Sequence, residues 1–215
     1  KIKRGRALVT AGPTFEAIDP VRFIGNLSSG KMGIALAKSL AQHGFEVDLV
    51  IGPITVEAPQ QSNILIHKVV SAQEMFDTCL PLFQKADIAI LAAAVADFRP
   101  QDAATQKIKK EDTDLIQLYL VKNPDILAHL GKIKRPNQTL IGFALETQNE
   151  LEHARKKLIS KNADMIVLNS LQDENAGFGF DTNKVTILKA DGTVLSIPMQ
   201  TKTEIAKSIV ACILS

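Results

Sequence analysis

Two kinds of hydrophobic pattern alternate along the chain. Short apolar runs rich in β-branched residues predict buried strands, and longer stretches in which apolar residues recur every three or four positions predict amphipathic helices. Through the first half of the chain the two alternate as βαβ units, which favours a parallel sheet covered by helices. The predicted strands are 6–11, 46–51, 64–70, 87–95, 115–121, 139–144 and 164–168, and the predicted helices are 29–43, 72–85, 124–131, 148–162 and one from 202 onward.

Helix ends carry their own signals. Asn123 followed by Pro124 predicts an N-cap and a first helical residue, and Gly131 predicts the end of that helix. Elsewhere, a Ser or Thr with a Glu three residues later is the pattern of a capping box, in which each side chain accepts a hydrogen bond from the other's backbone N–H. Three such segments begin at Ser71, Thr147 and Thr201.

The pattern changes after residue 96. Residues 97–114 are polar and rich in lysine, which predicts a long mobile flap loop. Residues 184–197 predict a β-hairpin, and the Asp191-Gly192 pair within it suits a type I′ turn. We find no internal repeat and no linker. The chain is therefore predicted to be one domain over residues 1–215, with an α/β, Rossmann-like, doubly wound and mostly parallel sheet.

Composition and charge exclude several classes of protein. With 46% hydrophobic and 22% charged residues the chain is globular, and a net charge of +2 with few aromatic residues argues against nucleic acid and anionic membranes as partners. Cys79 and Cys212 lie in apolar helical segments that favour buried, inert thiols. The four histidines have no metal-ligand spacing. No signal peptide or long apolar run is found, so we expect a cytoplasmic protein, cut from a longer parent because it starts at Lys1.

The unusual local sequences all follow predicted strands. They are residues 10–31, 93–107, 142–147 and 169–181. In a doubly wound sheet, ligands bind beyond the carboxyl ends of the strands. The sequence therefore predicts a site at that edge of the sheet.

The segment from Gly25 to Met32 nearly matches a P-loop. Met32 stands where a Ser or Thr would hold Mg²⁺, and the loop before the helix is too long, so the sequence argues against a P-loop NTPase. Ser28, Ser29 and Gly30 still suit a phosphate, because backbone N–H groups and the positive end of the helix dipole meet there. The alternative is that Ser28 or Ser29 merely caps the helix.

Two further motifs bear on the choice of chemistry. The turn after the first strand reads Ala11-Gly-Pro-Thr14 and lacks a dinucleotide fingerprint, and Tyr119 is followed four residues later by Asn123 instead of Lys. An NAD(P)-dependent oxidoreductase therefore becomes the alternative hypothesis. Lys157 and Lys161 share one helix face, which is either a solvated surface or a pair of ammonium groups for a triphosphate.

Seven segments, in order, resemble the bacterial phosphopantothenoylcysteine synthetase family, usually the carboxyl-terminal half of a bifunctional coenzyme A biosynthesis protein. They are VTAGPT (9–14), DPVRFI (19–24), NLSSGKMG (26–33), AAAVADF (92–98), KIKK (107–110), KNPD (122–125) and GFALET (142–147). The resemblance covers nearly the whole chain. Phe23, Gly25 and Phe98 depart from it, since Tyr, another small residue and Tyr are more usual there.

The resemblance implies a ligase that joins 4′-phosphopantothenate to L-cysteine with CTP and Mg²⁺, through an acyl-cytidylate. It implies catalytic roles for Arg22, Asn26 and Lys107, and a metal role for Asp97. By position, the substrate is bound by Arg22, Asn26, Ser28, Ser29 and Gly30, and the nucleotide by Ala93, Ala94, Asp97, Lys107, Pro124, Asp125, Ile126, Leu127, Phe143, Lys157 and Lys161.

The resemblance also implies partners. The family is dimeric, so we expect a homodimer, and FMN only if a flavin decarboxylase domain precedes this chain. A nucleotide-binding module without catalytic activity stays open as the alternative that is not an enzyme.

Overall fold

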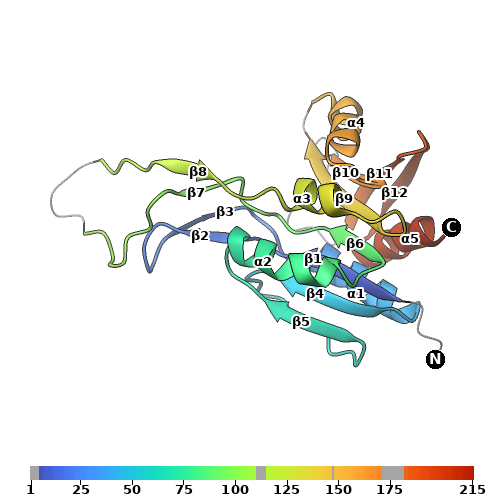
Figure 1. The fold of residues 1–215 in the computed structure, drawn as a ribbon, viewed down its shortest axis with the longest axis horizontal. Coiled ribbons are helices and arrows are strands. Elements are labelled where there is room, and N and C mark those ends of the chain that lie inside the picture. The colour runs from blue at the N-terminus through green and yellow to red at the C-terminus, as the bar shows by residue number, and fades with distance from the viewer. Residues whose placement is uncertain (1–4, 110–114, 147, 171–181) are drawn as a thin grey trace.

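A computed structural model describes residues 5–109, 115–146, 148–170 and 182–215 (Figure 1). Within these residues, an eight-stranded sheet has the order β12-β11-β10-β9-β6-β1-β4-β5. Its strands are β1 (Arg6–Ala11), β4 (Glu46–Ile51), β5 (Ile64–Lys68), β6 (Ile88–Leu91), β9 (Thr139–Glu146), β10 (Met165–Ser170), β11 (Thr182–Lys189) and β12 (Val194–Thr201). The helices are α1 (Lys31–Gln42), α2 (Ala72–Phe83), α3 (Ile126–Ile133), α4 (Glu150–Ser160) and α5 (Lys202–Leu214).

The sheet confirms the predicted fold class. From β5 through β4, β1, β6 and β9 to β10 every neighbouring pair is parallel, and the hairpin of β11 and β12 continues the sheet antiparallel. Taken by their order in the chain, the parallel strands lie 3-2-1-4-5-6, the arrangement of a dinucleotide-binding Rossmann fold. The order reverses between β1 and β6. Ligands of such sheets bind at that switch point.

Two hydrophobic cores lie on opposite faces of the sheet. Val9 and Leu49 belong to the core covered by α1 and α5, whereas their neighbours Leu8 and Val50 belong to the core covered by α2, α3 and α4. Alternate residues of one strand thus enter different cores. This is why the central strands read as continuous apolar runs. In the described part of the chain, no helix has both the length and the apolarity to cross a bilayer.

The helix starts differ from the predictions in instructive ways. The N-cap of α3 is Asp125, whose side chain accepts from the N–H of Ala128 at 2.8 Å, so the predicted start at Asn123 is two residues early. The predicted end at Gly131 is also wrong, since α3 continues to Ile133. A capping box is confirmed at Thr201.

The other two predicted capping boxes fare less well. At Ser71 the side chain accepts from Glu74, but the Glu74 carboxylate accepts from Val70, one residue before the N-cap. α4 begins after Asn149, which has φ 47° and makes no side-chain cap, while Thr147 lies outside the described residues.

Two predicted strands are shorter than expected, and one turn is of a different type. β5 stops at Lys68 and β6 at Leu91, where the chain leaves the sheet. In the hairpin of β11 and β12 the type I′ turn is wrong, because Gly192 has φ 91° while Asp191 is not in the left-handed region. Hydrogen bonds from Gly192 N to Lys189 O and from Lys189 N to Thr193 O define a three-residue loop with a glycine bulge instead.

Beyond the sheet, two small antiparallel ribbons extend together to one side of the molecule (Figure 1). One is β2 (Phe15–Ala17) with β3 (Phe23–Gly25), and the other is β7 (Phe98–Pro100) with β8 (Leu120–Lys122). β2 packs against β7. We call residues 15–25, 98–109 and 115–122 the arm. The sequence predicted only a loop over 97–114 and a strand over 115–121. The predicted loop contains β7 at its start, and the predicted strand overlaps β8 only at residues 120 and 121. Residues 110–114 lie outside the described part.

Gly131 provides a stability test in which two effects have opposite signs. Alanine is favoured over glycine inside a helix by about 1 kcal/mol. A Cβ at Gly131 would, however, lie 1.8 Å from the carbonyl oxygen of Lys161, a backbone atom that cannot rotate away. We expect Gly131→Ala to lower the free energy of unfolding by about 2 kcal/mol in urea denaturation. The exposed control Ser160→Ala should change it by less than about 0.5 kcal/mol. A more stable Gly131→Ala variant would refute this packing.

Candidate active site

The loops that follow β1 and β6 are tied together at the switch point. Thr10 Oγ1 accepts from Ala93 N at 3.1 Å, and Thr14 Oγ1 accepts from Ala96 N at 3.0 Å. Between them, Ala94 N donates to the carbonyl oxygen of Gly12 at 2.9 Å. Thr10 and Thr14 are buried, so their hydroxyl groups serve this connection and not solvent. The ties hold the chain after β6 against the first loop instead of letting it extend the strand.

Two adjoining cavities open at this edge. The loop cavity, of about 560 Å³, is lined by residues 26–33, 92–95, Asp97, 143–145, Lys157, Asn169, Asn183 and Lys202. The helix cavity, of about 460 Å³, is lined by Thr10, Leu91, Ala93, 95–98, 122–127, Phe143 and Lys157. Five residues line both, namely Ala93, Val95, Asp97, Phe143 and Lys157. Two ligands bound in these cavities would therefore meet at shared side chains.

The segment before α1 forms one wall of the loop cavity. Asn26 Nδ2 donates to the carbonyl oxygen of Val95 at 3.0 Å, which ties this wall to the loop after β6. The N-cap of α1 is Gly30, with φ 74° and no side-chain cap. Neither Ser28 nor Ser29 is therefore the N-cap residue. Ser28 Oγ accepts from the N–H of Gly30 at 3.3 Å, and Ser29 Oγ accepts from the N–H of Lys31, the first residue of α1, at 3.5 Å.

Lys157 in the last turn of α4 and Lys161 at its C-cap turn toward the protein. Lys157 Nζ donates to the carbonyl oxygen of Phe143 at 2.8 Å. Lys161 Nζ lies 2.8 Å from Asp125 Oδ2, and its side chain is 28% exposed. The interpretation as a solvated face therefore applies to their neighbour Lys156, which is exposed and pairs with Glu152, but not to Lys157 and Lys161.

Asp125 is held as a carboxylate by these contacts. Partial burial raises its pKa, but the hydrogen bond from Lys161, the N–H of Ala128 and the charge of Lys157 outweigh burial and keep the pKa below its usual value. Asp125 thus caps α3 and fixes Lys161 at the same time. One residue connects the helix cavity to α4.

Asn123 has a role that the sequence did not reveal. It was predicted to cap α3, but its Nδ2 donates to the carbonyl oxygen of Ala96 at 2.8 Å and its Oδ1 accepts from Arg99 at 3.1 Å. It therefore positions the loop after β6 against the chain that enters α3. Asn169 and Asn183, whose side chains bond to each other at 3.0 Å, also line the loop cavity. Neither was predicted as a site residue, although Asn169 begins the segment 169–181 that was expected at this edge. Their positions at strand ends were the only available signal.

Most predicted site residues come together, and three do not line either cavity. Asn26, Ser28, Ser29, Gly30, Ala93, Ala94, Asp97, Pro124, Asp125, Ile126, Leu127, Phe143 and Lys157 line at least one of them. Lys161 touches the helix cavity only through Asp125. Arg22 and Lys107 lie on the arm, where Lys107 is exposed and Arg22 pairs with Asp19.

Asp97 is an exposed carboxylate at the mouth of both cavities. In the described part of the chain, no group of three or more His, Cys, Asp or Glu side chains could enclose a metal ion. A single carboxylate still suits Mg²⁺, which keeps several waters and is commonly held by one or two carboxylates together with the phosphates of a nucleotide. The residues present therefore fit a metal that arrives with its nucleotide.

A family comparison decides what kind of domain this is. The model described as the DNA/pantothenate metabolism flavoprotein (DFP) C-terminal domain matches residues 2–215. The chain belongs to the DFP family. A DFP domain on a Rossmann-like sheet agrees with the fold and with a site at the switch point.

Known relatives of this DFP domain are longer proteins. The chain is 49% identical over 210 residues to a cysteine/cysteine sulfinic acid decarboxylase from an unidentified prokaryote, covering 98% of this chain and 58% of that protein. It is 45% identical over 202 residues to the coenzyme A biosynthesis bifunctional protein CoaBC of Bacillus subtilis, covering 94% of this chain and 49% of that protein. The DFP domain thus spans about half the length of the relatives it matches.

A solved structure supports the same assignment. The crystal structure of the C-terminal domain of a coenzyme A biosynthesis bifunctional protein CoaBC is 41% identical to this chain, with a TM-score of 0.82. The match covers 99% of this chain and 95% of that one. The fold of the DFP domain is therefore that of a CoaBC C-terminal domain.

The Lys161–Asp125 pair predicts a pH-dependent stability difference. Lys161→Met should lower the free energy of unfolding at pH 7 by about 0.5 kcal/mol, the usual worth of a partly exposed ion pair. Because the pKa of Asp125 is lowered in the folded state, the pair stabilises the protein above the unfolded-state pKa near 4 and loses its effect as the pH falls through the folded-state pKa. Denaturation curves of wild type and variant should therefore converge in acid.

A matched control is Lys132→Met, an exposed lysine in the last turn of α3. Its difference from wild type should not depend on pH between 7 and 3. A Lys161→Met difference that stays constant over the same range would contradict the ion pair.

Proposed function

We propose that this DFP domain joins 4′-phosphopantothenate to the amine of L-cysteine, using CTP, in coenzyme A biosynthesis. The observation that carries the proposal is the pair of adjoining cavities that share Asp97, Phe143 and Lys157 at the switch point. A ligase of this kind has to bring an anionic acid and a nucleoside triphosphate together. Membership of the DFP family and the likeness to CoaBC C-terminal domains support the same reaction.

The chemistry proceeds in two steps. A carboxylate resists attack by an amine because its oxygen is a poor leaving group. In the first step a carboxylate oxygen of phosphopantothenate attacks the α-phosphorus of CTP, a P–O bond breaks, and pyrophosphate leaves with acyl-cytidylate as the product. In the second step the cysteine nitrogen attacks the acyl carbon, CMP leaves, and the amine loses a proton. Both steps depend on positioning and on cations more than on a strong base.

We assign the helix cavity to CTP and the loop cavity to the acid. Lys157 and Lys161 already hold acceptor oxygens, those of Phe143 and Asp125, and would exchange them for phosphate oxygens. Pro124, Ile126 and Leu127 supply the apolar wall of the nucleotide cavity. Ala93 and Ala94 are small enough to let a ligand approach their backbone.

The loop cavity suits a phosphorylated acid. Ser28, Ser29 and Gly30 precede α1, so backbone N–H groups and the helix dipole favour a negative group there. Asn26 stands between this wall and Val95, where its amide would hold the acyl group. Arg22 is assigned to the substrate by resemblance, although its guanidinium is bound to Asp19 and Ile108.

Mg²⁺ is the metal we propose, held by Asp97 together with the CTP phosphates. It would neutralise phosphate charge as pyrophosphate leaves. Lys107, on the arm, is assigned to the reacting groups, where it would stabilise the charge that develops in the transition state. FMN is not proposed for this chain, and belongs to a decarboxylase domain if the parent protein has one.

A pyrophosphate-release assay tests the ligase directly. With phosphopantothenate, cysteine, Mg²⁺ and each of the four nucleoside triphosphates in turn, we expect release with CTP only. Lys107→Gln should lower turnover by more than about tenfold, since loss of one transition-state contact costs upward of about 1.4 kcal/mol. The matched control Lys109→Gln, an exposed lysine of the same segment, should retain activity within about twofold.

The same assay separates the alternatives. CTP binding without turnover would indicate a module that is not an enzyme, and binding of a reduced nicotinamide cofactor without a need for Mg²⁺ would indicate an oxidoreductase. Release of CO₂ from cysteine or cysteine sulfinate by this chain alone would favour the activity for which the 49%-identical relative is named. Absence of CTP-dependent pyrophosphate release would overturn the ligase.

We also propose that the protein forms a homodimer through the arm. Large apolar side chains are exposed there at a density unusual for the surface of a monomer. They are Val21, Phe23, Phe98, Leu115, Ile116, Leu118, Tyr119 and Leu120. A second copy of the same arm would cover them.

Sedimentation velocity tests the dimer. Tyr119 is 70% exposed, so Tyr119→Asp should leave the monomer folded and shift the protein from dimer to monomer at micromolar concentration. Leu65→Asp is the matched control, because Leu65 is 59% exposed on β5, away from the arm. A monomeric wild type, or a Tyr119→Asp variant that remains dimeric, would contradict an arm interface.

A further inference from the structure

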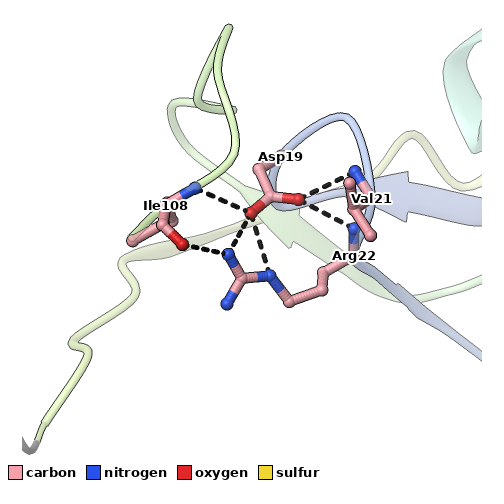
Figure 2. A network of polar contacts seen from close by, with 4 residues as sticks. All are labelled: Asp19, Val21, Arg22 and Ile108. Atoms are coloured by element: carbon pink, nitrogen blue, oxygen red, sulfur yellow. Dashed lines mark hydrogen bonds and ion pairs between the residues drawn. The ribbon is translucent and has the colours of Figure 1, made fainter. Parts of the chain in front are cut away.

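Asp19 is a buried carboxylate in the turn between β2 and β3. It is 3% exposed, and both of its oxygens are used (Figure 2). Oδ1 accepts from the backbone N–H groups of Val21 and Arg22, each at 2.8 Å. Oδ2 accepts from Arg22 Nε at 2.9 Å, from Arg22 Nη2, and from the N–H of Ile108 at 3.2 Å. Every group that contacts the Asp19 side chain is a hydrogen-bond donor, so this position requires a side chain with two acceptor oxygens.

The contact with Ile108 joins two segments far apart in the sequence. Arg22 Nη2 also donates to the carbonyl oxygen of Ile108 at 2.8 Å, so the Asp19–Arg22 pair binds both the N–H and the C=O of this one residue. Figure 2 shows the pair and Ile108 as a closed set of contacts. In the same turn, Ile18 O accepts from the N–H of Ala104 at 2.9 Å. Segment 104–108 is therefore fixed at both of its ends.

Lys107 lies within this fixed segment, next to Ile108. The Lys107 side chain is exposed, so its position depends on the backbone from which it extends. That backbone is held by the hydrogen bonds at Ala104 and Ile108. A lysine at the end of an unrestrained polar loop would lose much more conformational entropy when it engaged a ligand. Because the turn of residues 18–22 already fixes the backbone on both sides of Lys107, this lysine loses less conformational entropy when it engages a ligand.

The carboxylate stays ionised in this setting. Burial raises the pKa of Asp19, but the hydrogen bonds from Arg22, Val21 and Ile108 outweigh burial and hold the pKa well below its usual range. The ion pair with Arg22 is therefore present at any pH at which the enzyme would operate. Its strength does not depend on a proton.

We propose that Asp19 is a positioning residue for Lys107, acting through Arg22 and the backbone of Ile108. The inference rests on the proposed ligase function, in which Lys107 acts on the reacting groups. In this proposal, the Nε and Nη2 atoms of Arg22, which bind Asp19, hold segment 104–108 of the arm in place. Asp19 itself touches no substrate.

The test uses Asp19→Asn, which keeps the shape but presents an amide N–H₂ to donors. In the CTP-dependent pyrophosphate assay we expect kcat to fall by more than about fivefold while KM for CTP changes by less than about twofold. Asp102→Asn is the matched control, because Asp102 is an exposed aspartate of the same arm segment, and it should retain wild-type kcat.

A double mutant distinguishes positioning from a general structural effect. If Asp19 acts through Lys107, Asp19→Asn should lower kcat by less than about twofold in the Lys107→Gln background, since the two residues form one unit. Multiplied losses in the double mutant, or an unchanged kcat in Asp19→Asn alone, would overturn the proposal.

Amide hydrogen exchange gives a readout independent of activity. Exchange of segment 104–108 should speed up by more than about tenfold in Asp19→Asn and stay unchanged in Asp102→Asn. Unchanged exchange in Asp19→Asn would overturn the proposal that Asp19 holds segment 104–108. If the wild-type protein releases no pyrophosphate, the proposed ligase fails, while the exchange measurement still decides whether Asp19 holds this segment.

Discussion

The site depends on how the backbone N–H groups of the segment that follows β6 find hydrogen-bond acceptors. Ala93, Ala94 and Ala96 lie beyond the last strand residue, where no neighbouring strand accepts their hydrogen bonds. Buried N–H groups without partners are costly, so the chain after β6 has to lie where acceptors exist. The buried hydroxyl groups of Thr10 and Thr14 provide two of these acceptors, and both residues belong to β1 or to the loop that follows it. The two cavities form around this connection.

The sequence predicted the sheet well because buried parallel strands have a strong signal. Strands 6–11 and 46–51 match β1 and β4 to the residue. Alternate residues of each strand enter the two cores, so apolar residues stand at consecutive positions, 7–9 in β1 and 49–51 in β4. The run 87–95 was overextended for the same reason. Its last residues are apolar, but Ala93 N donates to the hydroxyl of Thr10 and Ala94 N donates to the carbonyl oxygen of Gly12, beyond the end of β1.

The arm could not be predicted from the sequence. Its strands have only three residues each, and their pairing joins Phe98 to Lys122 across a long insertion. Hydrophobic alternation carries no signal over three residues, and the apolar run 115–121 predicted a longer strand than β8, which begins only at Leu120. The predicted start of α3 was wrong for a related reason. Asn123 and Pro124 match a common cap, but the Asn123 side chain is taken by Ala96 and Arg99, contacts that exist only in the folded chain.

Aspartates at two places hold cations that the proposed reaction needs, and their burial separates their roles. The Asp19 side chain is fully buried, and its two oxygens are saturated by donors from two segments, so Arg22 cannot leave it without exposing an uncompensated charge. The Asp125 side chain is 51% exposed, and water can replace Lys161 there at little cost. The Asp19–Arg22 pair is therefore suited to a permanent structural role in the arm. The Asp125–Lys161 pair is suited to a lysine that exchanges its carboxylate partner for a phosphate. A chain with a net charge of only +2 can thus present cations locally, because Arg22 stays paired with Asp19 while Lys161 is held by Asp125 until a ligand competes for it.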